Sequence, residues 1–280
     1  MKIPDRLATR FPIQAVFGCL GALALAACEP NPVEWRGDAR EVATPAPSDE
    51  GAVPVDARLV LHPDGSPALE SIASVSTTPA DTAACPGSFR IAAASPTEIY
   101  SVWWSRRDGG RTLLLAARSD DAGETWTPSV PVDTTDRGSA GCARPGPAIA
   151  ADASSGYVHV TYFLNGPGGP GVFFAHSMER GELFHSPVPI MYGDRPSATA
   201  VAAADSVVVV AFEDPNSERS QIALAMSRTW GHIFARERPE ASTGAPRAER
   251  PLVALRQSVI AVGWHGKDRA VVARVGTLKH

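Results

Sequence analysis

A repeat with a period of about 50 residues constrains this chain more than any other feature of its sequence. Four segments each place an arginine directly before an apolar run, and these arginines are Arg90, Arg144, Arg195 and Arg250. The spacings between them are 54, 51 and 55 residues. A period of this length indicates a series of equivalent supersecondary units rather than one irregular domain.

Each repeat continues with further runs that are rich in Val, Ile, Phe, Trp and Tyr, and that Gly, Pro, Asp and Ser separate. The second runs are IYSVWWS, YVHVTYF, SVVVVAF and SVIAVGW. Third runs follow in all the repeats, and a fourth run follows in the first three: TPSVPVD, HSPVPIM and ARERPEA. Such units predict an all-β fold, a β-propeller of about four four-stranded blades.

The last repeat leaves no room for an outer strand of its own. A strand from residues 67–76 is expected to complete it, which would place both termini in one blade and leave no open edge. The alternative is a fifth, partial blade that begins at the sequence ARLVLHP (57–63).

The turn after the third run of the first repeat reads SDDAGETW, residues 119–126. Weaker copies lie at the same place in the next two repeats, SMERGELF (177–184) and SRTWGHIF (227–234). Hydroxyl and carboxylate oxygens accept hydrogen bonds from turn amides, glycine permits positive φ, and an aromatic ring fills apolar space. We therefore expect a structural turn built by Ser119, Asp121, Gly123, Thr125 and Trp126.

This turn resembles the Asp-box of the sialidase superfamily, and the sequence FRIAAA resembles that family's Phe-Arg-Ile-Pro segment, with Ala92 in place of proline. The resemblance runs from about Phe89 to His280 and implies that Arg90 contacts a carboxylate of a ligand. Catalytic members have six blades, an acid/base aspartate and a tyrosine nucleophile, and the chain after Phe89 is too short for six blades. Asp108 and Tyr192 are the candidates for those catalytic roles.

Strand direction groups the charged residues by face. If every first strand begins on one face, Arg90, Arg144, Arg195 and Arg250 share that face and the Asp-box turns lie on the opposite one. Four arginines around an axis would attract a carboxylate, sulfate or phosphate. The alternative is that each arginine pairs with nearby acids such as Asp194 or Glu249. Further acids expected on this face are Asp108, Glu213, Asp214 and Asp268.

The first 27 residues have the pattern of a bacterial signal peptide, with basic residues before an apolar stretch that ends in LAAC. This ending resembles a lipobox, which implies cleavage before Cys28, lipid on Cys28 and a bacterial envelope location; Glu29 favours the outer membrane. Residues 28–57 are rich in Pro and Ala and predict a disordered tether, so that the propeller domain would span 58–280.

Two cysteines, Cys85 and Cys142, remain after the signal and the lipidated residue are set aside. They lie before Arg90 and Arg144, in equivalent entry loops of neighbouring blades. In an oxidising compartment a pair of this kind predicts one disulfide.

The net charge and the motif content of the sequence argue against several classes of function. The chain has a net charge of −4, and loss of the signal's three basic residues and one acid leaves −6, which argues against nucleic acid as a partner. No metal-binding or cofactor-binding motif is present. We therefore expect a lipid-anchored, non-catalytic binding or scaffold module whose partner is an acidic glycan or an envelope protein. The alternative function is an exo-sialidase-like glycoside hydrolase of acidic sugars.

Overall fold

The computed structural model describes residues 31–43, 57–71, 75, 77–152, 154–235, 237–266 and 270–279. Within these ranges the regular structure consists of 18 β-strands and one short 3-10 helix, η1 (Asp108–Gly110). No helix in this part of the chain has both the length and the hydropathy that crossing a bilayer requires. Cys28, the expected signal peptide (1–27) and Asp268 lie outside the described residues.

The first two repeats each form a four-stranded antiparallel sheet, as the sequence predicts. Blade 1 contains β5 (Arg90–Ala93), β6 (Ile99–Arg106), β7 (Thr112–Ser119) and β8 (Val130–Asp133). Blade 2 contains β9 (Ala148–Ala151), β10 (Val158–Gly166), β11 (Gly169–Ser177) and β12 (Val188–Tyr192).

The third repeat forms a three-stranded sheet, which is one strand fewer than predicted. Blade 3 contains β13 (Thr199–Ala204), β14 (Val207–Glu213) and β15 (Ile222–Ser227). Among the described residues, the predicted fourth run (235–241) makes an isolated bridge to β15 through Ala223–Glu240, and Phe234, the last residue of the third box, makes another with Ser227. The two bridges differ in register, because six positions separate Phe234 from Glu240 whereas four separate Ser227 from Ala223, so this segment does not form one continuous ladder with β15.

The fourth repeat takes its outer strands from the N-terminal side of the chain. Blade 4 contains β16 (Glu249–Arg256), β17 (Val259–His265) and β18 (Val271–Leu278), and β18 also pairs with β1 (Val33–Trp35) and β2 (Arg40–Glu41). The prediction that a strand from residues 67–76 completes this blade is therefore wrong. The tether prediction is also wrong for residues 33–41, because these strands belong to the folded sheet.

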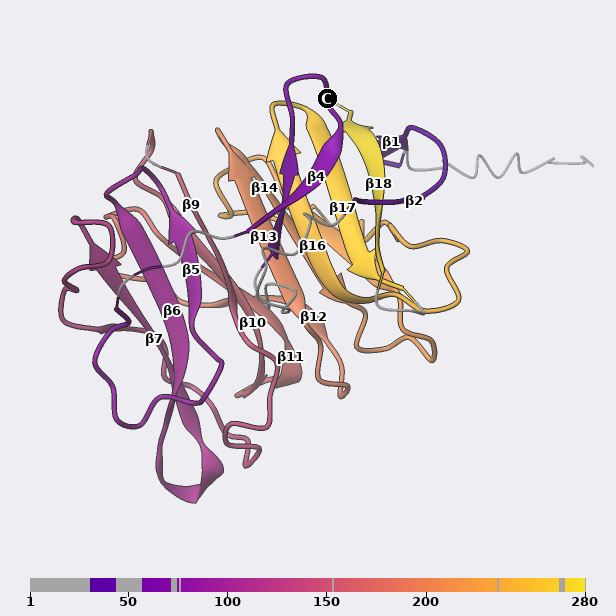
Figure 1. Cartoon of the computed structure of the whole chain (residues 1–280). Helices are drawn as coiled ribbons and strands as arrows, with labels where there is room; N and C mark the ends of the chain where they lie inside the picture. The colour runs from indigo at the N-terminus through magenta and orange to yellow at the C-terminus, as the bar shows by residue number, and fades with distance from the viewer. Residues whose placement is uncertain are drawn as a thin grey trace, which may run out of the picture. The chain divides into compact units, whose positions relative to one another are not determined.

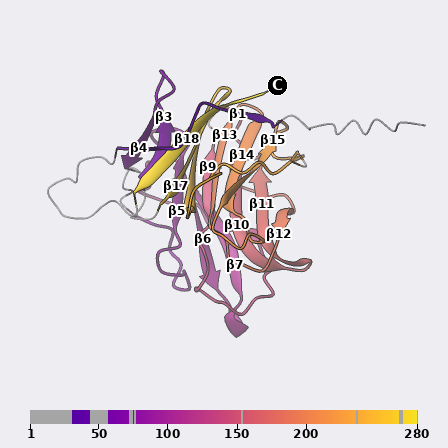
Figure 2. The same ribbon diagram turned by 90° about the vertical axis from the view of Figure 1, so that its right-hand side faces the viewer.

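A separate β-hairpin packs beside blade 4. It consists of β3 (Ala57–Leu61) and β4 (Pro67–Ser71), and β3 packs against β16 and β17. The hairpin matches the alternative of a fifth, partial blade that begins at Ala57. In Figure 1 the four blades follow one another from left to right in chain order, and in Figure 2 the hairpin lies beside β17 and β18. The fold is an all-β propeller with blades of three to five strands.

The core lies between neighbouring blades rather than inside any one sheet. Alternate side chains of the middle strands point to opposite neighbours, because successive residues of a strand face opposite sides. In β10, Val160 and Tyr162 join a cluster with Trp104 of blade 1, whereas Phe163 joins a cluster with Phe212 of blade 3. This two-sided burial explains why the second runs of the sequence are apolar throughout rather than alternating.

Strand alternation gives each blade two different ends. In blade 1, Arg90 lies opposite Val102, and the hairpin from Arg106 to Thr112 is at the same end of the sheet. Ile99 lies opposite Ser119, so the box loop after Ser119 is at the other end. We call the end with the blade-opening arginines the arginine end, and the end with the box loops (119–126, 177–184 and 227–234) the box end. The predicted opposition of the two faces is confirmed.

The first box loop is held by its own side chains. Ser119 Oγ accepts a hydrogen bond from the Gly123 amide at 2.8 Å, and Asp121 Oδ1 accepts one from the Thr125 amide at 2.8 Å. Bonds from the Thr125 hydroxyl and amide hold the pKa of Asp121 at about 2. Gly123 has φ +86°, which side-chain-bearing residues rarely adopt. Trp126 is half-buried and packs on the cluster around Trp103 rather than in the main core.

The predicted disulfide between Cys85 and Cys142 is present, with a Cα–Cα distance of 5.3 Å. It joins the loop before β5 to the loop before β9, and so ties the entries of blades 1 and 2 together. Cys85 is buried in the cluster between these blades, and its N–H donates to the carbonyl of Trp104.

Replacement of both cysteines by alanine should lower the free energy of unfolding. The chain-entropy model gives about 4 kcal/mol for a closed loop of 57 residues, as an upper value before strain is subtracted. Urea unfolding of the oxidised protein and of the double variant measures the difference. Equal unfolding midpoints would contradict the stabilising role.

Candidate functional site

The four blade-opening arginines lie at the arginine end as predicted, but their side chains are not equivalent. Arg144 is buried and forms an ion pair with Asp136 at 2.9 Å, with its guanidinium 5.0 Å from the centre of the Trp104 ring. Asp136 also accepts the Thr112 amide at 2.8 Å. A charge paired and covered in this way is not available to a ligand, so Arg144 has the structural role of the alternative interpretation, with Asp136 as the partner.

Arg90 is half-buried, and neutral groups hold its position. Its Nη1 donates to the carbonyls of Gly87 at 2.9 Å and Phe89 at 2.8 Å. The rest of the guanidinium lies against Gly146, where an added Cβ would be 2.7 Å from Nη2. Arg90 therefore reaches from blade 1 to the entry of blade 2, and the absence of a side chain at Gly146 makes this approach possible.

Arg195 and Arg250 also differ from each other: Arg195 donates through its side chain, and Arg250 donates through its backbone amide. Arg195 Nη2 donates to the carbonyl of Asp214 at 2.5 Å. Arg250 has φ +50°, and its amide donates to Glu213 Oε1 at 2.8 Å, while its side chain is exposed. In blade 4 it is thus the backbone of the arginine, rather than its charge, that binds the neighbouring acid.

Among the described residues, three of the four blade-opening arginines have no carboxylate within ion-pair distance. Within the described ranges, the arginines with a carboxylate inside 4.0 Å are Arg58, Arg118, Arg144, Arg180 and Arg247. Arg90, Arg195 and Arg250 are absent from this set. The predicted pairing with Asp194 or Glu249 is therefore not found among these residues, because Glu249 pairs with Arg247.

Further arginines at the same end were missed by the sequence reasoning. Arg106, Arg107 and Arg111 are exposed in the β6–β7 hairpin, and their side chains donate to backbone carbonyls. Arg137 is exposed on the loop 134–146, which bonds to this hairpin through the Gly141 amide and the Gly110 carbonyl at 2.7 Å. The sequence SRRDGGR (105–111) carries the signal for this cluster, since it places three arginines within six residues.

The two catalytic candidates belong to different blades. Asp108 is exposed in η1 at the hairpin of blade 1, whereas Tyr192 is 47% exposed at the end of β12, the outer strand of blade 2. The Tyr192 ring packs edge-on against Phe173, and its carbonyl accepts from Asn216. Within the described residues, no hydrogen bond joins Asp108 and Tyr192 or connects either to a blade-opening arginine.

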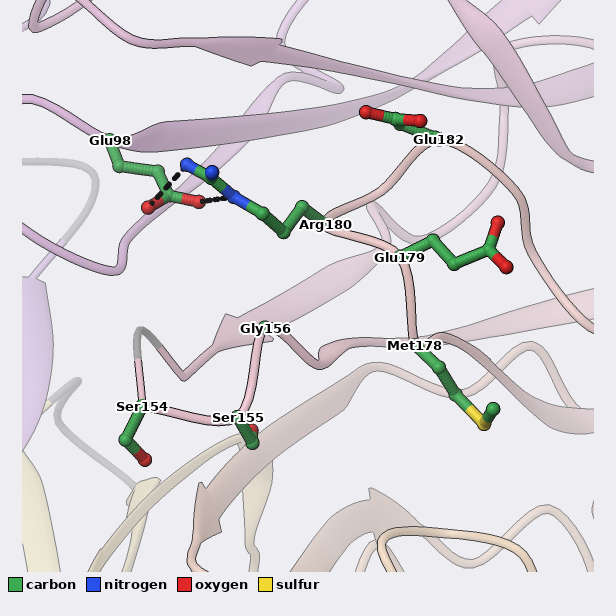
Figure 3. Close-up of a pocket in the computed structure, with 8 residues that line it drawn as sticks. All are labelled: Glu98, Ser154, Ser155, Gly156, Met178, Glu179, Arg180 and Glu182. Carbon is green, nitrogen blue, oxygen red and sulfur yellow. Dashed lines mark hydrogen bonds and ion pairs between the residues drawn. The ribbon is translucent and has the colours of Figure 1, made fainter.

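An open depression of about 550 Å³ lies at the box end between blades 1 and 2 (Figure 3). Arg180 crosses it and binds Glu98 through two bonds of 2.9 Å, and Glu98 also accepts the Tyr100 hydroxyl. Burial and the bond to Glu98 raise the pKa of Tyr100 to about 12. The phenol is therefore protonated near neutral pH and is a poor nucleophile.

Four histidines gather at the box end between blades 2 and 3. His159 and His176 face each other across β10 and β11 and are buried, while His185 and His232 are exposed. The rings of His176 and His232 are 4.5 Å apart, and those of His176 and His185 are 4.8 Å apart. The described residues contain no group of three or more potential ligands arranged to hold a metal ion.

Burial is the main cause of the altered acidity of these histidines. It lowers the pKa of His159 to about 3 and that of His176 to about 4, and the neighbouring imidazoles lower both further. Both rings are therefore neutral in the folded protein at neutral pH.

Comparison with known proteins finds similarity only among solved structures. No protein-family model and no curated protein matches the chain. The Hadza microbial sialidase Hz136 aligns with a TM-score of 0.49 and 16% identity, over 69% of this chain and 44% of that one. The Bacillus subtilis arabinanase Arb43A aligns with a TM-score of 0.42 and 10% identity, over 76% and 82% of the two chains.

The NanB sialidase from Streptococcus pneumoniae aligns with a TM-score of 0.42 and 15% identity, over 69% of this chain and 30% of that one. The chain therefore spans less than half the length of either sialidase.

The buried histidines should make the fold sensitive to acid. Because the folded pKa of His159 is below the ordinary 6.5, its stabilising effect is complete above pH 6.5 and is lost as the pH falls below that value. At pH 5 the loss is about 2 kcal/mol for His159, and His176 acts in the same direction. Urea unfolding at pH 7.5 and pH 5 should show a smaller loss for His159→Phe than for the wild type.

His62→Gln is the matched control, because His62 is exposed in the β3–β4 hairpin. It should keep the pH dependence of the wild type. A His159→Phe variant that loses as much stability on acidification as the wild type would contradict this account.

Proposed function

We propose that this protein is a non-catalytic binding module of the bacterial envelope, anchored by lipid on Cys28, that binds an anionic ligand at the arginine end. The observation that carries the proposal is the state of Arg90. Its guanidinium is half-buried, oriented by two backbone carbonyls, and has no carboxylate partner among the described residues. An oriented cation without a counter-charge is suited to an incoming anion.

The chemistry of the site favours a carboxylated or sulfated glycan over a single small anion. A guanidinium binds carboxylate and sulfate oxygens through parallel N–H groups. Arg106, Arg107, Arg111 and Arg137 extend the positive charge outward from Arg90 on two loops that bond to each other. A polymer with repeated acidic groups can meet several of these arginines at once, and each exposed contact adds a small and salt-sensitive contribution.

Placement of acids and phenols supports a binding role over hydrolysis. Glycoside hydrolysis needs an acid and a nucleophile on opposite sides of one bond, a few ångströms apart. Among the described residues, no hydrogen bond joins Asp108 to Tyr192, the Tyr100–Glu98 pair is at the box end, and the Tyr162–Asp133 pair is buried. An acidic glycan is the proposed partner, with an envelope protein as the other candidate; nucleic acid is not proposed, because the anchor would place the domain in the envelope.

Binding to an immobilised acidic polysaccharide tests this proposal. The full chain should bind polygalacturonate and dextran sulfate but not neutral dextran, and added salt should weaken the binding. Arg90→Gln should weaken it about tenfold, because a hydrogen bond to a charged group contributes about 1.5–3 kcal/mol. The triple replacement of Arg106, Arg107 and Arg111 by Gln should weaken it by a similar factor.

Arg256→Gln is the matched control, because Arg256 is an exposed arginine at the box end of β16. It should bind as the wild type does. Unchanged binding by the Arg90 and triple variants would contradict the assignment of the site. Release of sialic acid from a fluorogenic sialoside by the wild type would favour the exo-sialidase-like alternative instead.

A further inference from the structure

Large apolar side chains are exposed at the box end of blades 2 and 3. Met178 and Leu183, in the second box loop, are 43% and 61% exposed, and Trp230 and Ile233, in the third, are 39% and 70% exposed. Among the described residues, Tyr192 is the only other large apolar side chain that is exposed. Apolar side chains gathered on adjacent loops indicate a contact surface more strongly than apolar residues scattered singly.

The hydrogen bonds that shape these box loops do not involve the exposed apolar side chains, although the Trp230 ring also stacks on Tyr157. Ser177 Oγ accepts the Gly181 amide at 3.1 Å, and Ser227 Oγ accepts the Gly231 amide at 3.0 Å, as in the first box loop. The terminal aromatic residue of each loop, Phe184 or Phe234, packs inward against the interblade clusters. The exposed residues therefore lie between the serine and the inward aromatic residue of each loop, and their side chains make none of the serine–glycine bonds.

The N-terminal strand enters the domain at the same end. Val33 pairs with Leu278, and the amide of Lys279 donates to the carbonyl of Pro32 at 2.9 Å. The carbonyl of Lys279 in turn accepts a bond from Arg228, which is in the third box loop. The start of β1 and the loop that carries Trp230 are therefore neighbours.

Chain length then limits how far a lipid on Cys28 can be from this surface. Val33 is five positions after Cys28 in the sequence. A fully extended segment of that length spans at most about 18 Å. A lipid anchor at Cys28 would hold the box end, and not the arginine end, close to the bilayer.

We propose that the box end of blades 2 and 3 rests on the lipid bilayer, with Met178, Leu183, Trp230 and Ile233 in the interface between headgroups and acyl chains. This inference depends on the proposed anchoring at Cys28. Tryptophan is favoured at the headgroup level, and aliphatic side chains enter the acyl boundary. The flanking charges are mixed, with Glu179, Arg180 and Glu182 in the second box loop and Arg228 in the third, so the proposed contact is apolar rather than electrostatic.

The orientation has a consequence for the proposed binding site. Because the arginine end is opposite the box end of every blade, it would face away from the membrane. A glycan that is fixed elsewhere in the envelope would then reach Arg90 and its neighbours without passing between the domain and the bilayer.

Fluorescence quenching by lipids tests the proposed surface. Ile233→Cys, labelled with an environment-sensitive fluorophore, is compared with Ser139→Cys, an exposed position in the arginine-end loop 134–146. The full chain is purified from membranes and reconstituted into vesicles of phosphatidylethanolamine and phosphatidylglycerol with nitroxide-labelled lipid. The probe at position 233 should be quenched several-fold more than the probe at position 139, and mass spectrometry of the N-terminal peptide reports separately whether Cys28 carries lipid.

The two measurements test the membrane-facing surface and the lipid anchor separately. Lipid on Cys28 with no quenching at position 233, or with stronger quenching at position 139, would overturn the surface and leave the anchor. Quenching at position 233 without lipid on Cys28 would support the surface and overturn the anchor, and absence of both would overturn both. A probe at 233 that is shielded from aqueous iodide but not quenched by nitroxide lipid would assign this edge to a protein partner or a second copy, against the proposal.

Discussion

Strict antiparallel alternation of strands within each blade is the constraint on which the rest of this structure depends. Because every blade opens at the same end, its second and third strands return the chain so that the box loop lies at the opposite end. Burial of the middle strands on both faces makes a change of register costly, since a slip by one residue would exchange their two sets of packed side chains. The blades therefore carry two chemically different ends, one with arginines and one with compact turns.

The packing between neighbouring blades determines which arginine side chains a ligand can reach. Arg144 lies over Trp104 in the tight contact between blades 1 and 2, and such a position requires the partner carboxylate of Asp136. Arg90, at the edge of that contact, is held by carbonyls and keeps its charge for the solvent side. The disulfide between Cys85 and Cys142 ties together the two loops that border Arg90. The binding proposal thus rests on an arginine that the fold orients without neutralising.

Much of the fold could be predicted from the sequence, because the repeat period, the apolar runs and the turn residues all act locally. The blade positions, the opposition of the two ends and the disulfide were predictable for that reason. The closing strand was not: Val33–Trp35 lies in a proline-rich segment with no periodicity, and its pairing with β18 is a contact between the two ends of the domain. At the site, the shared position of the arginines followed from strand direction. The capture of Arg144 by Asp136 depends on how a loop packs, and the exposed arginines of the β6–β7 hairpin lay outside the repeat pattern that drew attention to Arg90.

Amide hydrogen exchange of the full chain, with and without polygalacturonate, tests the central claim most directly. If the arginine end binds anions, the polymer should slow exchange in the loop before Arg90, in the β6–β7 hairpin and in the loop 134–146. The box loops at 119–126, 177–184 and 227–234 should exchange at unchanged rates. Protection confined to the box loops, or no protection in any segment when the polymer is in excess, would contradict the account.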